Sequence, residues 1–343
     1  MKKNTLYIKL IFALLIIANV KAVAQDIHFS QFYETTILNN PALTGVFDGD
    51  YKAGAIYRNQ WGSVGVPFQT TLINLESKVR VNTANDYLSF GLLGYFDKAG
   101  TINFSTLGLY PAINYNKSME DKYGSYLDVG FTGGYIQRSI DVSKMTFDNQ
   151  YQGGIILPIS TSENIPNPKM NYFDLGAGVI FNSSLDEENQ INYFIGAAAY
   201  HFTSPKASFY SGTKDANLSI RWDGNAGLNY NFDETYALQF YINAMFQSPY
   251  QEIVGGAMLK WSAVNGNNSQ PFSLYLGAFY RFQDAWIPAL KIQYRRNSFG
   301  ISYDVNNSTL KNVTGMHGGF EISLINTGMF VAGYDDKHQC PRF

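Results

Sequence analysis

The stretch LSIRWDGNAGLNYNF, residues 218–232, alternates between two kinds of side chain along its whole length. Apart from glycine, the even positions are apolar or aromatic, as at Trp222, and the odd positions are polar, as at Asp223. Because successive side chains of a strand point to opposite faces, this period of two predicts a β-strand with one apolar face. A globular strand typically has about 5–6 residues, whereas a tilted membrane strand needs about 9–11 residues inside the bilayer. The length of the stretch favours a membrane strand.

The same alternation recurs along the chain. Residues 236–247 place Phe240 on one face and Gln239 on the other, and residues 273–282 behave in the same way. We expect about 14 such strands, near residues 51–61, 69–79, 86–97, 103–117, 123–138, 170–182, 189–203, 217–232, 234–247, 250–262, 271–283, 286–296, 298–306 and 313–325. An even number suits a closed antiparallel barrel, because closure removes sheet edges that lipid cannot satisfy. The prediction is therefore an all-β fold, a transmembrane antiparallel β-barrel of the outer membrane over residues 51–325.

A soluble sandwich or propeller would give the same alternation, with its apolar face turned inward. Composition favours the membrane barrel, since charged residues make up only 15% of the chain and aromatic residues 16%, against about 25% charged residues in soluble domains. After residue 24 no apolar run reaches the length of a membrane-spanning helix. Tryptophans of such a barrel belong at the membrane interfaces rather than in a ligand site, and these are Trp61, Trp222, Trp261 and Trp286.

The first residues are those of an export signal. Lys2, Lys3 and Lys9 give a positively charged start, which is followed by a short apolar run over residues 10–20. Ala22-Val23-Ala24 then forms a cleavage site. The run is too short for a comfortable membrane anchor, so we expect a signal peptide at residues 1–24. Residues 25–50 would then form an N-terminal periplasmic or lumenal segment, and residues 326–343 a C-terminal periplasmic tail. The tail holds the single cysteine, Cys340, so no internal disulfide framework is expected.

The segment HFSQFYETTILNNPALTG, residues 28–45, fits neither a helix nor a strand, yet it is too apolar to lie in water. Asn39-Asn40-Pro41 and Thr44-Gly45 interrupt any regular structure. We expect it to pack into the periplasmic mouth of the barrel as a partial plug or latch, the alternative being a disordered leader to the first strand. The plug prediction depends on the apolar and aromatic side chains and on the proline of this segment, namely Phe29, Phe32, Tyr33, Leu38 and Pro41.

Connection lengths predict the orientation of the barrel. With the N-terminus in the periplasm, every second connection is periplasmic and short, as in RVNTAND and NFDET. The opposite set contains the two longest loops, residues 139–169 and 204–216, which we expect outside the cell.

The polar faces carry charges of both signs, which the alternation points into the lumen. One interpretation is a conducting, solute-selective pore, and the other is a network of ion pairs that braces the interior. The mixed signs favour the network, because a selective pore often has one dominant sign. The lumen-lining charged candidates are Lys52, Arg58, Glu76, Asp128, Arg221, Asp223, Arg281, Lys291, Arg295, Asp304 and Glu321.

No motif predicts an enzyme, a metal site or a cofactor. The four histidines are scattered, and no H-E-x-x-H, C-x-x-C or G-x-S-x-G spacing is present. A barrel-embedded hydrolase would need a pair such as His317 and Ser323, whose simpler interpretation is two polar lumen residues. The net charge of −2 predicts no nucleic-acid partner.

An ordered set of motifs resembles the PorP/SprF family of type IX secretion system membrane proteins over the whole mature chain. The matching stretches are QDIHFSQFYETTILNNPALTG (25–45), YRNQW (57–61), MTFDNQYQGG (145–154), YFDLGAGVIF (172–181), QSPYQEIVGGAMLKW (247–261), YRFQDAWIPALKIQY (280–294), GISYDVNNSTL (300–310), GGFEISL (318–324) and CPRF (340–343). Each motif alone is weak, and the ordered set is specific.

The resemblance implies an outer-membrane barrel of gliding, secreting bacteria of the Bacteroidetes type. It further implies a non-enzymatic component of the type IX secretion and gliding machinery. Such a component would bind the C-terminal sorting domain of a secreted adhesin, for export or surface retention, and would contact other secretion components at the outer membrane and in the periplasm. The competing interpretation of the sequence is a porin-like solute channel.

Overall fold

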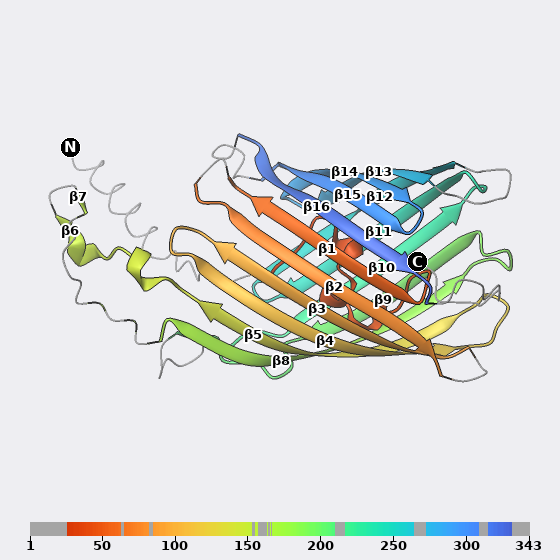
Figure 1. The fold of residues 1–343 in the computed structure, drawn as a ribbon, viewed down its shortest axis with the longest axis horizontal. Coiled ribbons are helices and arrows are strands. Elements are labelled where there is room, and N and C mark those ends of the chain that lie inside the picture. Colours follow the sequence, from red (N-terminus) through yellow and green to blue (C-terminus); the bar gives the residue numbers. More distant parts are fainter. Residues whose placement is uncertain are drawn as a thin grey trace, which may run out of the picture.

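The computed structural model describes residues 26–62, 65–81, 85–152, 155–156, 163, 165, 167–209, 217–263, 272–308 and 315–330. Its main body is a closed antiparallel barrel of 14 strands, in which the last strand pairs with the first (Figure 1). The predicted signal peptide, Cys340 and most of the predicted C-terminal tail lie outside the described residues. No helix among the described residues is long and apolar enough to cross a membrane.

The barrel strands agree closely with the predicted segments. Their bounds are β1 Tyr51–Gln60, β2 Phe68–Arg80, β3 Tyr87–Ala99, β4 Phe104–Ser118, β5 Tyr126–Ser139, β8 Lys169–Ser184, β9 Ile191–Tyr200, β10 Arg221–Asn231, β11 Tyr236–Gln247, β12 Tyr250–Ala263, β13 Phe272–Arg281, β14 Ala285–Tyr294, β15 Asn297–Asn306 and β16 His317–Gly328. The last strand continues three residues beyond the predicted end of the barrel at residue 325. Two short strands, β6 (Tyr151–Gln152) and β7 (Ile155–Ile156), form a separate hairpin in the loop between β5 and β8.

Two ends of the barrel differ in their connections. At one end, here called the short-turn end, the strands are joined by residues 81–86, 119–125, 185–190, 232–235, 264–271 and 295–296. The other end, called the long-loop end, carries residues 140–168 and 201–220 together with shorter connections. The short-turn end corresponds to the set predicted to be periplasmic. In Figure 1 the long-loop end is on the left, and β5 and β8 extend beyond the other strands there.

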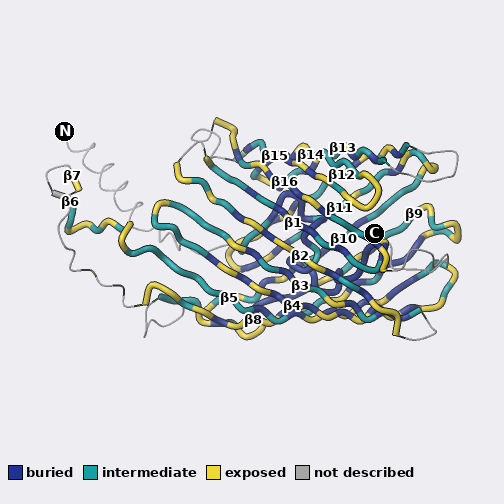
Figure 2. The backbone as a smooth tube through the Cα atoms, in the orientation of Figure 1, coloured by how far each residue is buried: buried dark blue, intermediate teal, exposed yellow. Residues whose placement is uncertain are grey.

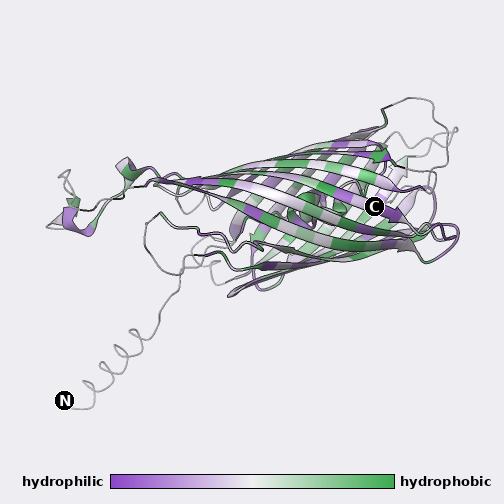
Figure 3. Ribbon diagram, turned by 90° about the horizontal axis from the view of Figure 1, so that it is seen from below, coloured by the Kyte–Doolittle hydropathy of each residue, from purple (hydrophilic) through white to green (hydrophobic). Residues whose placement is uncertain are grey.

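Each strand has one face outside the barrel and one inside. Along β4 and β5 buried and exposed residues alternate almost without interruption, and the tubes of Figure 2 show the same alternation over the wall. In β10 the side chain of Trp222 is 57% exposed, while Arg221, Asp223 and Asn225 on the other face are buried. Figure 3 shows hydrophobic and hydrophilic residues alternating along the strands of the wall. The apolar face is therefore the outer one, and a soluble sandwich or propeller is excluded.

The four tryptophans lie at or near strand ends. Trp222 and Trp286 are exposed near the long-loop end, where Trp286 packs on Tyr280 with ring centroids 4.5 Å apart. Trp261 is exposed near the short-turn end and contacts Phe272. These positions agree with the interface girdle predicted from the sequence.

Residues 26–50 form a compact segment inside the barrel, drawn in red in Figure 1. It contains three short helical turns, η1 (Phe32–Glu34), α2 (Thr36–Asn39) and η2 (Pro41–Leu43). Asn40 begins η2, because its side-chain oxygen accepts a hydrogen bond from the Ala42 amide at 2.9 Å and Pro41 follows at the first helical position. The sequence signal that breaks regular structure at Asn39-Asn40-Pro41 thus starts a new turn.

Candidate functional site

The N-terminal segment fills much of the lumen, and residues 26–47 are here called the plug. Its apolar side chains enter three clusters with the inner face of the barrel. Phe29 and Leu38 pack with residues of β1 to β5, and Phe32 packs against Phe279 with ring centroids 5.6 Å apart. Leu43 joins the third cluster, around β8 and β9. Because all three clusters are buried, the plug is held by the same apolar burial that holds a protein core.

Glycines on the inner wall let the plug backbone approach closely. A Cβ atom at Gly130 in β5 would overlap the backbone of Pro41 and Ala42. At Gly178 in β8 it would overlap the side chain of Asn40. Pro41, predicted to belong to the plug, is buried at this contact. The two glycines therefore form the surface on which η2 rests.

In the long-loop half of the barrel, buried charges hold the beginning of the plug. This set, here called the latch network, consists of Arg58, Glu252, Arg281, Asp304 and Glu321. Arg58 pairs with Glu321 at 2.7 Å and with Asp304 at 3.2 Å, and Arg281 pairs with Asp304 at 3.0 Å.

Every part of the latch network reaches the plug. Glu321 accepts hydrogen bonds from the amides of residues 30 and 31, at 2.6 and 2.8 Å. Arg58 donates to the carbonyl of His28 at 2.8 Å, and the hydroxyl of Ser30 bonds Asp304. Burial, together with Arg58 and Arg281, holds the pKa of His28 well below its usual value, so this ring is neutral. The charges of the network are thus paired with one another and bonded to plug atoms.

Asp26, the first described residue, also lies toward the long-loop end. Its carboxylate is 2.8 Å from His201, the first residue of the long loop after β9, and 2.8 Å from Arg221, the first residue of β10. Burial opposes its ionisation, but His201 and Arg221 outweigh this effect and lower the pKa of Asp26. His201 is buried too, and Asp26 and Asp174 nevertheless raise its pKa to about 9. The start of the plug is therefore fixed by an ionised pair.

Nearer the short-turn end, strand side chains bond the plug backbone directly. Asn114 donates to the carbonyls of Ala42 and Thr44, both at 2.8 Å. Lys78 donates to the carbonyls of Gly45 and Phe47, at 3.1 and 2.5 Å. The plug thus runs from the long-loop half to β1, which starts at the short-turn end. We expected the segment to pack into the periplasmic mouth of the barrel as a partial plug or latch. In the structure it extends from the short-turn end into the long-loop half, because its apolar side chains have buried partners along that length.

The charged candidates from the sequence lie inside the barrel, with one exception. Arg295 is exposed in the turn between β14 and β15, and its guanidinium lies over the ring of Tyr294. Its φ of 53° interrupts the extended backbone, so side chains no longer alternate between the two faces of a strand there. The lumen prediction for Arg295 was wrong, because the strand was expected to continue through it. Asp128 is buried without an ion pair among the described residues and accepts from Asn116 and Asn182.

Three other candidates pair close to the plug. Arg221 bonds Asp223 at 2.8 Å. Glu76 accepts from the hydroxyl of Thr36 and the amide of Gly45.

The proposed hydrolase pair is not a pair in the fold. His317 and Ser323 are six residues apart on the extended strand β16, or roughly 20 Å at about 3.3 Å per residue. His317 instead contacts the hydroxyl of Tyr303 at 2.9 Å, and Ser323 donates to the side chain of Gln31 in the plug at 2.6 Å.

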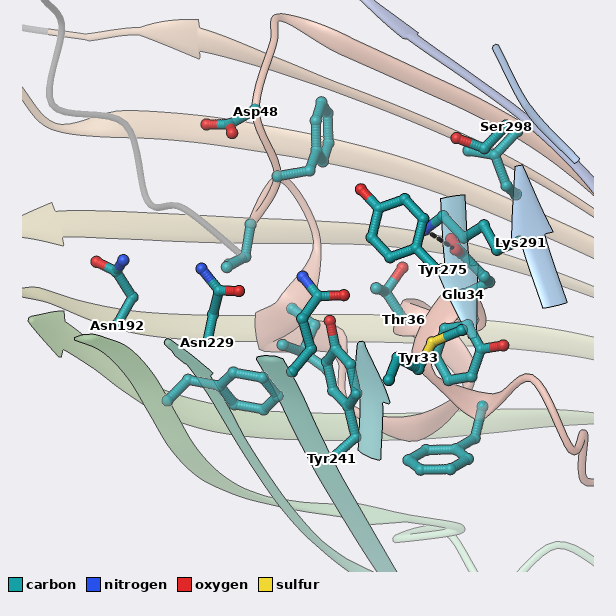
Figure 4. A pocket seen from close by; sticks show the side chains of 18 of the residues that line it. Tyr33, Glu34, Thr36, Asp48, Asn192, Asn229, Tyr241, Tyr275, Lys291 and Ser298 are labelled. Atoms are coloured by element: carbon teal, nitrogen blue, oxygen red, sulfur yellow. Dashed lines mark hydrogen bonds and ion pairs between the residues drawn. The ribbon is translucent and has the colours of Figure 1, made fainter. Parts of the chain in front are cut away.

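The plug leaves a cavity of about 370 Å³ toward the short-turn end, bounded by β9 to β14, the neighbouring ends of β15, β16 and β1, and the plug itself. In the close-up of Figure 4, Asn192 and Asn229 project into it from one side, and Tyr275 and Lys291 from the other. Its inner end is formed by aromatic rings, with Tyr33 stacked on Tyr241 at a centroid distance of 5.6 Å.

The charges of the cavity are only partly paired. Glu34 of the plug is 2.8 Å from Lys291 and 3.7 Å from Lys52, and these two cations lower its pKa against the opposing effect of burial. The ammonium of Lys260 lies 5.8 Å from the centroid of the Tyr275 ring. Glu34 does not pair with Lys260; the carboxylate that acts on Lys260 at longer range is Asp48, which lines the same cavity.

Several of these functional residues were not identified from the sequence. Asn114, Lys78 and His201 bond plug atoms, and Lys260 lines the cavity, yet none was among the candidates. The alternation places Lys78 and Asn114 on inner faces, so the signal was available for these two. His201 lies in a loop, where no periodicity indicates a direction.

Groups of three or more metal-ligating side chains are absent from the described part of the chain. A comparison with curated proteins gave no match. Among solved structures, the CymD monoaromatic hydrocarbon channel is similar at 10% identity and a TM-score of 0.49, over 86% of this chain and 93% of that one. A Pseudomonas aeruginosa FadL homologue is similar at 10% identity and a TM-score of 0.48, over 85% and 93%. At this level of similarity neither structure carries an argument about function.

The family comparison covers nearly the whole barrel together with the plug. The model for the type IX secretion system membrane protein PorP/SprF matches residues 22–325. This range includes the plug and all strands up to β16. The chain is an outer-membrane β-barrel and belongs to the PorP/SprF family of type IX secretion system membrane proteins.

Proposed function

We propose that this barrel is a non-enzymatic component of the type IX machinery that binds the C-terminal sorting domain of a secreted adhesin, for its export or its retention at the cell surface. Other secretion components at the outer membrane and in the periplasm would be its further partners. The observation that carries the proposal is the seated plug in a barrel of this family. A barrel whose interior is filled by a packed, ion-paired segment has a fixed structure where a channel would have a path for solutes.

Burial of the plug supports this proposal over a channel. Arg58 and Glu321, which line the lumen, are 1% exposed and bond each other and plug atoms. A solute-selective pore leaves such charges in contact with water and ions. Because loss of one partner would leave an uncompensated buried charge, these pairs favour the conformation in which the plug is seated.

The proposal is tested in cells by deleting the gene and following the adhesin encoded beside it. We expect the adhesin to remain unsecreted or to be released into the medium, and the intact gene to restore surface display. A strain that lacks the barrel and still displays the adhesin normally would contradict the proposal. A further secreted protein that carries no sorting domain serves as the control for general secretion.

A porin-like channel is the second candidate, and the cavity at the short-turn end favours it to a limited extent. Purified protein in planar bilayers would then conduct steadily. We expect no steady conductance, because the latch network and the plug lie between the cavity and the long-loop end.

A further inference from the structure

The filled part of the lumen shows how this barrel wall holds a peptide. The backbone of the plug forms hydrogen bonds with strand side chains, since among the described residues it does not pair with a strand backbone. Asn114 donates to two carbonyls, those of Ala42 and Thr44, and Glu321 accepts from the amides of residues 30 and 31. The wall therefore binds extended or turning backbone through amide and charged side chains.

The wall of the cavity carries the same kinds of side chain. Asn192, Asn229 and Gln239 are direct partners across β9, β10 and β11, so their side chains form one row. Asn225 and Asn243 form a second row of partners deeper in the cavity. An amide side chain has both donors and an acceptor. In the second row these are already in use, because Asn225 donates to Asn243 and accepts from Asn40 of the plug, so the first row is the one that a ligand can reach. The side-chain oxygen of Asn229 is buried without a hydrogen-bond partner among the described residues.

Among the described residues, three lysines and two carboxylates line the cavity, and the excess of one positive charge favours an acidic ligand; they are Lys52, Lys260, Lys291, Glu34 and Asp48. Lys260, Tyr275 and Lys291 are successive partners across β12, β13 and β14, so two ammonium groups flank one ring. Glu34 pairs with Lys291 and not with Lys260. A carboxylate entering the cavity would meet Lys260 without displacing an existing ion pair.

We propose that this cavity holds a second peptide segment, an extended stretch of the secreted partner that enters from the short-turn end and places a carboxylate on Lys260. The inference rests on the proposed function only in naming the secreted adhesin as the source of the segment. Peptide is favoured over saccharide because the opposite part of the same wall already holds peptide by the same bonds. Tyr33 of the plug and Tyr241 of β11 stack on each other in the lining of the cavity, and the segment would enter from the short-turn end.

The binding test uses the full mature barrel in nanodiscs and a phage-displayed library of random nonapeptides. We expect acidic sequences to be enriched over empty nanodiscs. The variant Lys260→Glu should lower that enrichment about tenfold or more, because it places like charges together. Lys122→Glu is the matched control: it makes the same charge change at the same end of the barrel, on an exposed side chain outside the cavity.

A second variant, Asn229→Leu, removes an amide from the first row without changing charge, and we expect it to lower enrichment as well. Retention of heat-modifiable electrophoretic mobility shows that each variant is folded. Absence of any enrichment, or equal enrichment by the parent and by Lys260→Glu, would overturn the inference. Binding of a tetragalacturonate probe without any peptide binding would instead identify an acidic-saccharide site and would also overturn it.

Failure of this inference is distinguishable from failure of the proposed function. A strain carrying Lys260→Glu that displays the adhesin normally removes the cavity from the mechanism and leaves the export role intact. Normal display in the strain lacking the whole barrel removes the export role.

Discussion

The two halves of the lumen treat buried charge in opposite ways. In the long-loop half, the latch network pairs its charges internally and with plug atoms, so that Arg58 and Glu321 are both 1% exposed. In the short-turn half, Lys260 and the amides of β9 to β11 face an open cavity. Both halves arise from the same alternation of polar and apolar residues. The difference indicates that the position of the plug, rather than the strand pattern, determines whether inner side chains form a buried ion-pair network or line a cavity that can bind a ligand.

Removing the plug is the largest change that this comparison predicts. Deletion of residues 28–45 should leave the strands in place and convert the long-loop half into a second open space. We expect steady conductance in planar bilayers, together with loss of adhesin display in cells. Heat-modifiable mobility of the deletion variant is the control for barrel insertion. If neither conductance nor display changes, the segment is not a plug.

Breaking the latch network should have the second-largest effect, a loss of free energy of unfolding. Arg58→Ala leaves Glu321 and Asp304 buried with fewer partners, and we expect it to lower the free energy of unfolding by about 3–5 kcal/mol. Lys122→Ala breaks an exposed pair with Glu187 and should cost only about 0.2–1 kcal/mol. Denaturant unfolding in detergent measures both. Equal effects of the two variants would contradict a buried network.

Raising the pH should loosen the start of the plug. His201 has a pKa raised from 6.5 to about 9 in the folded chain. A raised pKa contributes stability that is fully present below pH 6.5 and is lost as the pH rises through about 9. We expect a loss of about 3 kcal/mol over this window, as the imidazolium facing Asp26 loses its proton.

Denaturant midpoints measured from pH 6 to pH 10 check this pH dependence. The variant His201→Gln keeps a side chain of similar polarity without the titration, so its midpoints should lack the His201 slope. A parent protein with the same pH profile as this variant would show that the pair does not hold the plug.

The smallest effect concerns the surface on which η2 rests. Gly130→Ala places a methyl group against the backbone of Pro41 and Ala42, and we expect a cost of about 1–3 kcal/mol. Gly133→Ala is the matched control on the same strand, because its Cβ lies on the outer face and meets only Leu175, at 3.8 Å. The plug contact is disproved if the two substitutions cost the same in denaturant unfolding.

Strand number, strand positions and the direction of most side chains could be predicted from the sequence. The alternation at Trp222 and Asp223 continues through β10, because membrane strands repeat one rule over many residues. The presence of a plug was also predictable, since Phe29, Phe32 and Leu38 need a buried surface. Where a strand ended early, as before Arg295, the rule was extended too far.

The site itself could not be predicted in the same way, because its contacts join residues far apart in the chain. Asp26 and His201 are 175 residues apart, and no local pattern relates them. The depth of the plug depends on which inner positions are glycine, and Gly130 and Gly178 acquire their meaning only once η2 is placed against them. The cavity is likewise defined by what the plug leaves unfilled.

The latch network couples the closure of the barrel to the seating of the plug. Arg58 and Glu321 are direct partners across β1 and β16, the pair of strands that closes the barrel, and they are 263 residues apart in the chain. Both also hold residues 28–31. The contact between the first and last strands and the attachment of the plug therefore depend on the same two side chains. Separation of β1 from β16 would also break the bonds that hold residues 28–31.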